Sequence, residues 1–119
     1  IAFSEMGVDW LAATMPVDER TMQPMKILHG GATLALAETV GSGLSVAFTD
    51  PRQYVVKGQA LSANHLKSAT KGYVKAVARF LRRGKASDVI DVFVYDEQED
   101  VISVIRMINA IRKANGHEQ

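Results

Sequence analysis

The sequence has no cysteine, which excludes every kind of site that depends on a thiol. Disulfide bonds, cysteine-ligated metals and a cysteine nucleophile cannot occur in this chain. The chain has only three histidines. A set of metal ligands is therefore not predicted, and we expect no bound metal.

The chain also lacks an excess of charge of either sign. Its 14 basic and 13 acidic residues leave a formal net charge of +1. A nearly neutral chain does not produce the strong positive field that nucleic acids or membrane surfaces attract, so we expect neither as a partner.

Long uninterrupted apolar runs are scarce as well. Residues 27–48 form the longest one, and it contains Glu38 together with many Gly, Ser and Thr residues. An acidic residue at the centre of a membrane span costs about 2.5–3.5 kcal/mol on insertion scales, so we expect no span. No basic-then-apolar leader is present, so we expect a cytoplasmic protein. We expect a single domain over residues 1–119 and, because the chain opens at Ile1, some missing N-terminal sequence.

The stretch 27–48 reads ILHGGATLALAETVGSGLSVAF, and Glu38 is its only formally charged residue. A helix without a polar face is expected to be buried on every side, wrapped by a curved sheet or by other elements. A carboxylate inside such a helix is costly to desolvate unless it has a partner. Glu38 is therefore either a structural acid bonded to neighbouring backbone or a functional group.

Two glycines, Gly30 and Gly31, precede the helical run and allow a ligand to approach closely. The first turn of a helix offers unpaired N–H groups and a positive dipole end, which suit a developing oxyanion. Glu38 follows Gly30 by eight residues, or about 12 Å along one helix, whereas each group must come within about 3 Å of a reacting atom. If both groups act together, two antiparallel copies must meet, with Glu38 of one copy near Gly30 of the other.

Four sequence patterns carry a family resemblance. They are Gln23-Pro24, His29-Gly30-Gly31, Leu36-Ala37-Glu38-Thr39 and Ser62-Ala63-Asn64-His65-Leu66-Lys67-Ser68. Together they resemble the hotdog-fold acyl-CoA thioesterases of the PaaI-like superfamily. The resemblance is greatest to enzymes that hydrolyse aromatic acyl-CoAs such as 4-hydroxybenzoyl-CoA and 1,4-dihydroxy-2-naphthoyl-CoA.

The resemblance implies roles for four residues of a catalytic site, and helical spacing adds Ser42 as a fifth candidate. Glu38 matches the catalytic carboxylate, which acts either as a nucleophile or as a base for water. Gly30 matches the glycine whose N–H polarises the thioester carbonyl. Gln23 and His29 match side chains that hydrogen-bond around the carbonyl or the leaving sulfur, although His29 could instead be a capping residue. Ser42 lies one turn after Glu38, where its hydroxyl could hold water or simply permit close helix packing.

Coenzyme A carries phosphates, so basic and polar residues are expected at the mouth of the pocket. The candidates are His65, Lys67, Ser68, Arg82, Arg83, Lys85 and Ser87. Relatives tend to show G-R-x-T followed by an aromatic residue. This chain has Gly84-Lys85-Ala86-Ser87 and then Asp88, which leaves the nucleotide contacts and the acyl preference open.

The remaining pattern predicts an α+β hotdog fold of one helix and a curved antiparallel sheet of about five strands. We expect a bent strand over residues 1–17, a loop over 18–26, and strands over 54–68, 74–80, 89–95 and 101–111. The last four strands are expected to be separated by a turn at Lys71-Gly72, a basic loop over residues 82–85 and an acidic turn over residues 96–100.

The resemblance implies hydrolysis of acyl-CoA thioesters with aromatic or medium-sized acyl groups, and no cofactor apart from the coenzyme A of the substrate. It also implies a homodimer with shared sites that pairs again into a homotetramer. A non-catalytic acyl-CoA-binding module remains an alternative, as does a hotdog dehydratase, although His29 is followed by Gly-Gly rather than by a hydratase motif.

Overall fold

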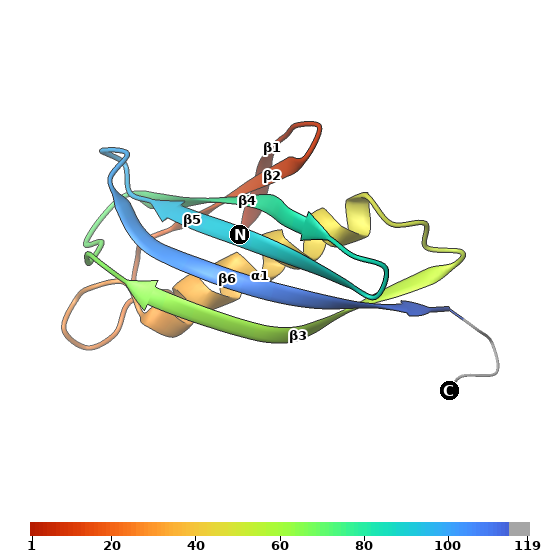
Figure 1. Ribbon diagram of the computed structural model, residues 1–119. Coiled ribbons are helices and arrows are strands. Elements are labelled where there is room, and N and C mark those ends of the chain that lie inside the picture. The colour runs from red at the N-terminus through yellow and green to blue at the C-terminus, as the bar shows by residue number, and fades with distance from the viewer. Residues whose placement is uncertain (115–119) are drawn as a thin grey trace.

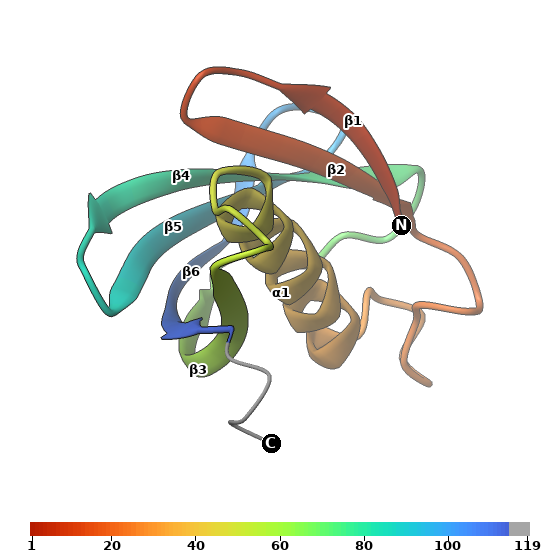
Figure 2. The same ribbon diagram turned by 90° about the vertical axis from the view of Figure 1, so that its right-hand side faces the viewer.

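The computed structural model describes residues 1–114, which form one helix and six strands. The strands are β1 (Ala2–Met6), β2 (Trp10–Pro16), β3 (Tyr54–His65), β4 (Tyr73–Arg83), β5 (Ser87–Tyr95) and β6 (Val101–Lys113), and the helix is α1 (Gly30–Ala47). All neighbouring strands are antiparallel, in the order β1-β2-β4-β5-β6-β3. The sheet curls around α1 (Figures 1 and 2), which confirms the α+β hotdog architecture.

The N-terminal segment is a hairpin, so the expectation of a single bent strand is wrong and the sheet has six strands instead of about five. The chain reverses at Gly7, whose N–H donates to the carbonyl of Trp10 (2.9 Å), and β1 then pairs with β2. A Cβ atom at Gly7 would lie 1.9 Å from Nε1 of Trp10, so the indole packs where a side chain would otherwise stand. The glycine therefore makes a turn and not a bend.

The four predicted strands after the helix are confirmed, and each of them differs from the expectation by one to three residues at one or both ends. Val74, Ala76 and Ala78 are fully buried on one face of β4, as the alternation predicts. β3 ends at His65, three residues earlier than expected. The expected basic loop is shorter, because β4 continues to Arg83 and pairs there with β5 after an irregularity in the register.

The helix is buried on one side only, which corrects the expectation that it is buried on every side. Leu36, Val40 and Leu44 are fully buried against the sheet. The opposite face carries Gly31 and Glu38, both exposed, because the strands curl around only part of the helix (Figure 2). Among the described residues, no helix is long and apolar enough to cross a lipid bilayer.

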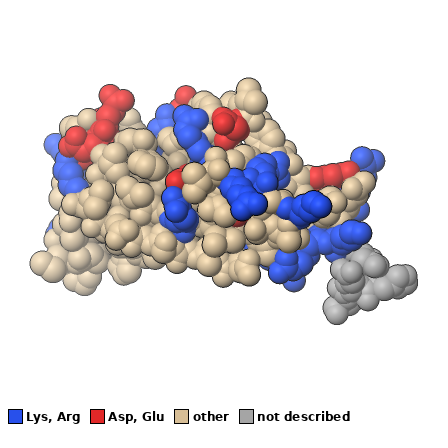
Figure 3. Space-filling view, viewed as in Figure 1, with Lys and Arg blue, Asp and Glu red and all other residues tan. Residues whose placement is uncertain are grey.

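The two ends of α1 lie at opposite ends of the molecule (Figure 1). Its N-terminus lies at the same end as the β5–β6 turn, and its C-terminus lies near the β4–β5 turn. In Figure 3 the basic side chains gather mainly over the end that carries the β4–β5 turn. The fold thus separates the start of the helix from the more basic end of the molecule.

Candidate functional site

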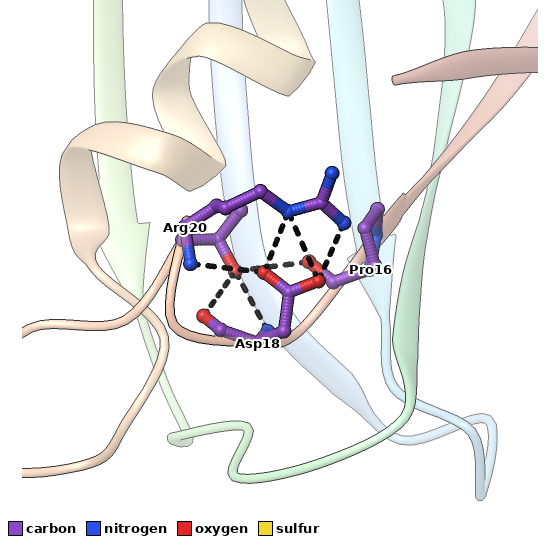
Figure 4. Close-up of polar contacts among 4 residues, drawn as sticks. Pro16, Asp18 and Arg20 are labelled. Carbon is purple, nitrogen blue, oxygen red and sulfur yellow. Dashed lines mark hydrogen bonds and ion pairs between the residues drawn. The ribbon is translucent and has the colours of Figure 1, made fainter.

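The loop between β2 and α1 is anchored where it leaves β2 (Figure 4). Nη2 of Arg20 donates to Asp18 (2.6 Å), and the hydroxyl of Thr21 donates to the carbonyl of Pro16 (2.9 Å). The hydrogen bond from Arg20 holds the pKa of the Asp18 carboxyl below its ordinary value. The carbonyl of Thr21 then accepts from the N–H of His29 (2.7 Å), so the loop returns to the start of the helix.

His29 caps the N-terminus of α1. Its backbone is extended, and its Nδ1 accepts a hydrogen bond from the N–H of Gly31 (2.9 Å). Because Nδ1 accepts, the ring proton of neutral His29 is on Nε2. In the part of the chain that the structure describes, no acceptor contacts the N–H of Gly30. The first turn therefore presents one free donor at the positive end of the helix dipole.

Gln23 presents a second donor at the same place. Its Oε1 accepts a hydrogen bond from the N–H of Met25 (2.7 Å), so the NH₂ group of the amide is available to donate to a ligand. The pocket that Gln23 lines has a volume of about 200 Å³. Its lining comprises Gln23, Ile27, Leu28, Gly30, Thr33, His65, Lys67, Ser68, Ala69, Ile102 and Ser103.

His65 lies beside Gly30 in this pocket. A Cβ atom at Gly30 would be 3.2 Å from Nε2 of His65, so the ring occupies the space that a side chain at Gly30 would need. On its other edge, Nδ1 of His65 lies 2.7 Å from Oγ of Ser103. Sequence reasoning did not single out Ser103, because a serine inside an apolar strand pattern carries no signal of its own.

Lys67 and Ser68 also line the pocket, but the charge of Lys67 is already compensated. Its ammonium group donates to Asp96 (2.8 Å) and to Asp100 (2.6 Å). The hydrogen bonds to Asp100 and Asp96 raise the pKa of Lys67, and the bond from Lys67 lowers the pKa of Asp96. Lys67 therefore joins two turns and adds little net positive charge to the pocket.

The other residues predicted to contact coenzyme A lie at the opposite end of the helix. A hollow of about 620 Å³ is lined there by Arg83 and Lys85, and Ser87 begins β5 nearby. Arg83 is held in place, since it donates to the carbonyl of Phe48 (3.0 Å) and to Asp88 (3.2 Å). The 18 residues of α1 span about 27 Å. One chain therefore cannot bring the candidates near Lys67 and the candidates near Arg83 to the same phosphate.

Glu38 is exposed on the open face of α1, and Ser42 follows it by one turn and is half-buried. A Cβ atom at Gly58 would lie 3.5 Å from Oε2 of Glu38, so the carboxylate rests beside the edge strand β3. Over residues 1–114, no side chain forms an ion pair or a hydrogen bond with this carboxylate.

The structure thus brings Gln23, His29, Gly30 and His65 together at the start of the helix. It does not bring Glu38 to them within one chain, because eight helical residues, or about 12 Å, lie between Gly30 and Glu38. Among the described residues that line this pocket in a single chain, several are hydrogen-bond donors and none is an Asp or a Glu that could act on a bound electrophile.

Comparison with known proteins identifies the family. Residues 25–103 match the model of the thioesterase superfamily. The chain is 41% identical over 111 residues to the 1,4-dihydroxy-2-naphthoyl-CoA hydrolase of Escherichia coli, which covers 93% of this chain and 81% of that enzyme. It is 42% identical over 111 residues to the proofreading thioesterase EntH of Cronobacter sakazakii, with 93% and 80% covered.

Solved structures agree with the sequence matches. The thioesterase HI1161 of Haemophilus influenzae has a TM-score of 0.94 to this chain at 36% identity, and the match covers 98% of this chain and 81% of that one. A mutant of the thioesterase PA1618 of Pseudomonas aeruginosa has a TM-score of 0.92 at 36% identity, with 94% and 81% covered. The fold, the family model and the relatives lead to one conclusion: the chain belongs to the thioesterase superfamily and is a hotdog-fold thioester hydrolase.

Proposed function

We propose that this protein hydrolyses acyl-CoA thioesters at a site shared by two copies of the chain. The free N–H of Gly30 and the amide of Gln23 hold the thioester carbonyl of the substrate. Glu38 of the second copy acts on that carbonyl. The observation that carries the proposal is the separation of these groups: the donors lie in one pocket, and the helix's only carboxylate faces outward.

The open face of α1 supports contact with a second helix. Gly31, Ala35, Glu38, Ser42 and Val46 follow one another at spacings of three or four residues, so they form one stripe along the helix, named here the open stripe. Most of these residues are small, which allows another backbone to approach closely. Glu38 is the only charged residue of the open stripe and lies at its middle.

Strand β3 supports the same arrangement. It is an edge strand of 12 residues that, within residues 1–114, pairs only with β6, so no described strand pairs with its outer N–H and C=O groups. An edge of this length is a template for pairing with another strand. Glu38 lies against Gly58 of β3, so one contact between two copies could cover the open stripe and the edge of β3 together.

The chemistry follows from these positions. Glu38 either attacks the carbonyl carbon or removes a proton from the water that attacks it. The negative charge that develops on the carbonyl oxygen is stabilised by the N–H of Gly30 and the amide of Gln23. The C–S bond then breaks. The hydroxyl group of water becomes part of the free acid, and its remaining hydrogen goes to the sulfur of the thiol. We propose that the hydroxyl of Ser42 holds this water beside Glu38.

Antiparallel helices would also bring the basic end of one copy near the pocket of the other. Arg82 and Lys85 then serve the phosphates of coenzyme A, since neither forms an ion pair within residues 1–114. The acyl groups that we propose are aromatic or medium-sized, because the relative from Escherichia coli is named for an aromatic acyl-CoA.

Replacing Glu38 by Gln tests the proposal. The substitution preserves size and removes the charge that acts on the carbonyl, so we expect kcat to fall by about 10²–10⁴-fold with little change in KM. The measurement is thiol release from a panel of aromatic and medium-chain acyl-CoAs. Glu97→Gln, on the exposed β5–β6 turn, is the matched control and should retain the parent's activity.

Hydrolysis by Glu38→Gln within a few-fold of the parent would assign Glu38 a structural role and remove the proposed mechanism. A parent protein that binds acyl-CoA without releasing thiol would instead be a binding module.

A further inference from the structure

His65 is held at the end of β3 by its neighbour on β6. His65 and Ser103 are partners in the register of these two strands, and Nδ1 of the imidazole lies 2.7 Å from the hydroxyl oxygen of Ser103. Ser103 is only 2% exposed, so its hydroxyl group is shielded from water. The contact therefore decides how an otherwise exposed imidazole is oriented.

The hydroxyl of Ser103 has one hydrogen to donate. In the described part of the chain, its only side-chain hydrogen bond is the one with His65. If Nδ1 of His65 carried the ring proton, it would donate to Ser103 and leave the buried hydroxyl hydrogen without an acceptor, which is unfavourable. If the ring proton is on Nε2, Ser103 donates to Nδ1 and both groups are satisfied. This assignment follows from the hydrogen-bond network.

The Nε2 edge of the ring faces the start of the helix. A Cβ atom at Gly30 would lie 3.2 Å from Nε2 and 3.6 Å from Cδ2 of His65. The free N–H of Gly30 and the amide of Gln23 line the same pocket, so an N–H group on His65 would be a third donor there. A pocket with several donors suits the atoms of a thioester that gain negative charge during hydrolysis.

We propose that Ser103 is a positioning residue that holds His65 as its Nε2–H tautomer, with that N–H donating to the thioester group of the substrate. No proton is transferred in this role, since neutral His65 acts as a hydrogen-bond donor. The proposal rests on the proposed function for its substrate, and it extends the site to a residue on β6.

The sharpest comparison is between Ser103→Thr and Ser103→Val, because these side chains share one shape and differ by the hydroxyl. We expect the Thr variant to stay within about threefold of the parent, and the Val variant to lose about 10-fold in kcat with KM nearly unchanged, as expected for the loss of one orienting hydrogen bond. Ser103→Ala, which cannot overfill the site, should behave as the Val variant. Ser4→Ala on β1 is the control at a distant, exposed serine.

A double-mutant cycle separates positioning from a general structural role. If Ser103 acts through His65, Ser103→Val should cause no further loss of kcat in a His65→Ala background. Losses that multiply would overturn the proposal, because Ser103 would then act independently of His65. Equal kcat values for the Thr and Val variants, whether both intact or both reduced, would also overturn it.

The tautomer is measured without any substrate. ¹⁵N NMR of the imidazole groups in the intact protein should show His65 as the Nε2–H form in the parent and in Ser103→Thr, and as an average of the two tautomers in Ser103→Val. An Nδ1–H form in the parent would overturn the proposal whatever the activity. If the parent hydrolysed no thioester, the proposed function would fail, and the same spectra would still support or refute the tautomer that Ser103 imposes.

Discussion

Arg82 and Arg83 are neighbours in the sequence, but only Arg83, whose side chain is 40% exposed, forms an ion pair with a buried carboxylate. Its partner Asp88 is 1% exposed and also accepts a hydrogen bond from the hydroxyl of Ser45 (2.8 Å). Asn109 donates to the same hydroxyl (2.9 Å), so the ion pair belongs to a buried network beneath the C-terminal end of the helix. Arg83 therefore has a structural role, which the sequence-based assignment to phosphate binding missed.

Replacing Arg83 by Ala should reduce the free energy of unfolding by about 1–2 kcal/mol, since the buried carboxylate of Asp88 loses a charged donor but keeps its hydrogen bond from Ser45, and the arginine side chain is itself 40% exposed. Arg82→Ala is the matched control and should change stability by less than about 0.5 kcal/mol. Urea unfolding, at one protein concentration for all variants, measures both values.

Adding Asp88→Asn to Arg83→Ala should recover part of the lost stability, because an amide costs less to bury than a carboxylate. Equal urea midpoints for Arg82→Ala and Arg83→Ala would contradict this prediction. They would show that water solvates the Asp88 carboxylate once the guanidinium of Arg83 is removed.

At the scale of elements, one lysine ties the segment after β3 to the β5–β6 turn. Lys67 donates to Asp96 and Asp100, and Asp96 also accepts from the backbone N–H groups of Gln98 (3.0 Å) and Asp100 (3.0 Å). Because the pKa of Asp96 is lowered by folding, its stabilising contribution is complete above about pH 4 and is lost as the pH falls through the lowered value. The pKa of Lys67 is raised by folding, so its stabilising contribution is complete below about pH 10.4. This contribution is lost as the pH rises through the raised value.

We therefore expect Lys67→Met to lower the melting temperature near neutral pH, and we expect its difference from the parent to shrink as the pH is lowered below about 4. Thermal unfolding followed by circular dichroism between about pH 2.5 and pH 7 measures this. Lys71→Met, at an exposed lysine of the same connection, is the control. A constant difference at every pH would mean that the packing of the lysine stem, and not its charge, stabilises the connection.

For the whole molecule, the proposed site requires at least two copies. Light scattering at micromolar concentration should give at least twice the chain mass of 13.0 kDa, as a dimer or as a dimer of dimers. Ala35→Arg places a long charged side chain on the open stripe, so it should shift the protein toward single chains and abolish thioester hydrolysis together. Ala47→Arg, at an exposed residue near the helix end and outside the open stripe, should do neither. An active parent with the mass of one chain would refute the shared site.

The sequence alone predicted the features that depend on neighbours along the chain. The apolar, weakly charged run predicted the position of α1, and the alternation of Val74, Ala76 and Ala78 predicted the buried face of a strand. Gly72, which has a φ of 75°, lies at the predicted turn. The motif around Gly30 and Glu38 indicated the family that the comparisons then confirmed. These features are readable because helix and strand periods, turn residues and short motifs involve residues close in sequence.

The tertiary structure decided what depends on partners far apart in the sequence. Strand register alone put Ser103 beside His65, and the curl of the sheet left Glu38 exposed on the open stripe. The length of the helix separates His65 from Arg83, although the sequence makes both of them candidates for contacts with the coenzyme A of the substrate. Such pairings arise from the register of strands and the packing of the helix, so no pattern of neighbouring residues encodes them.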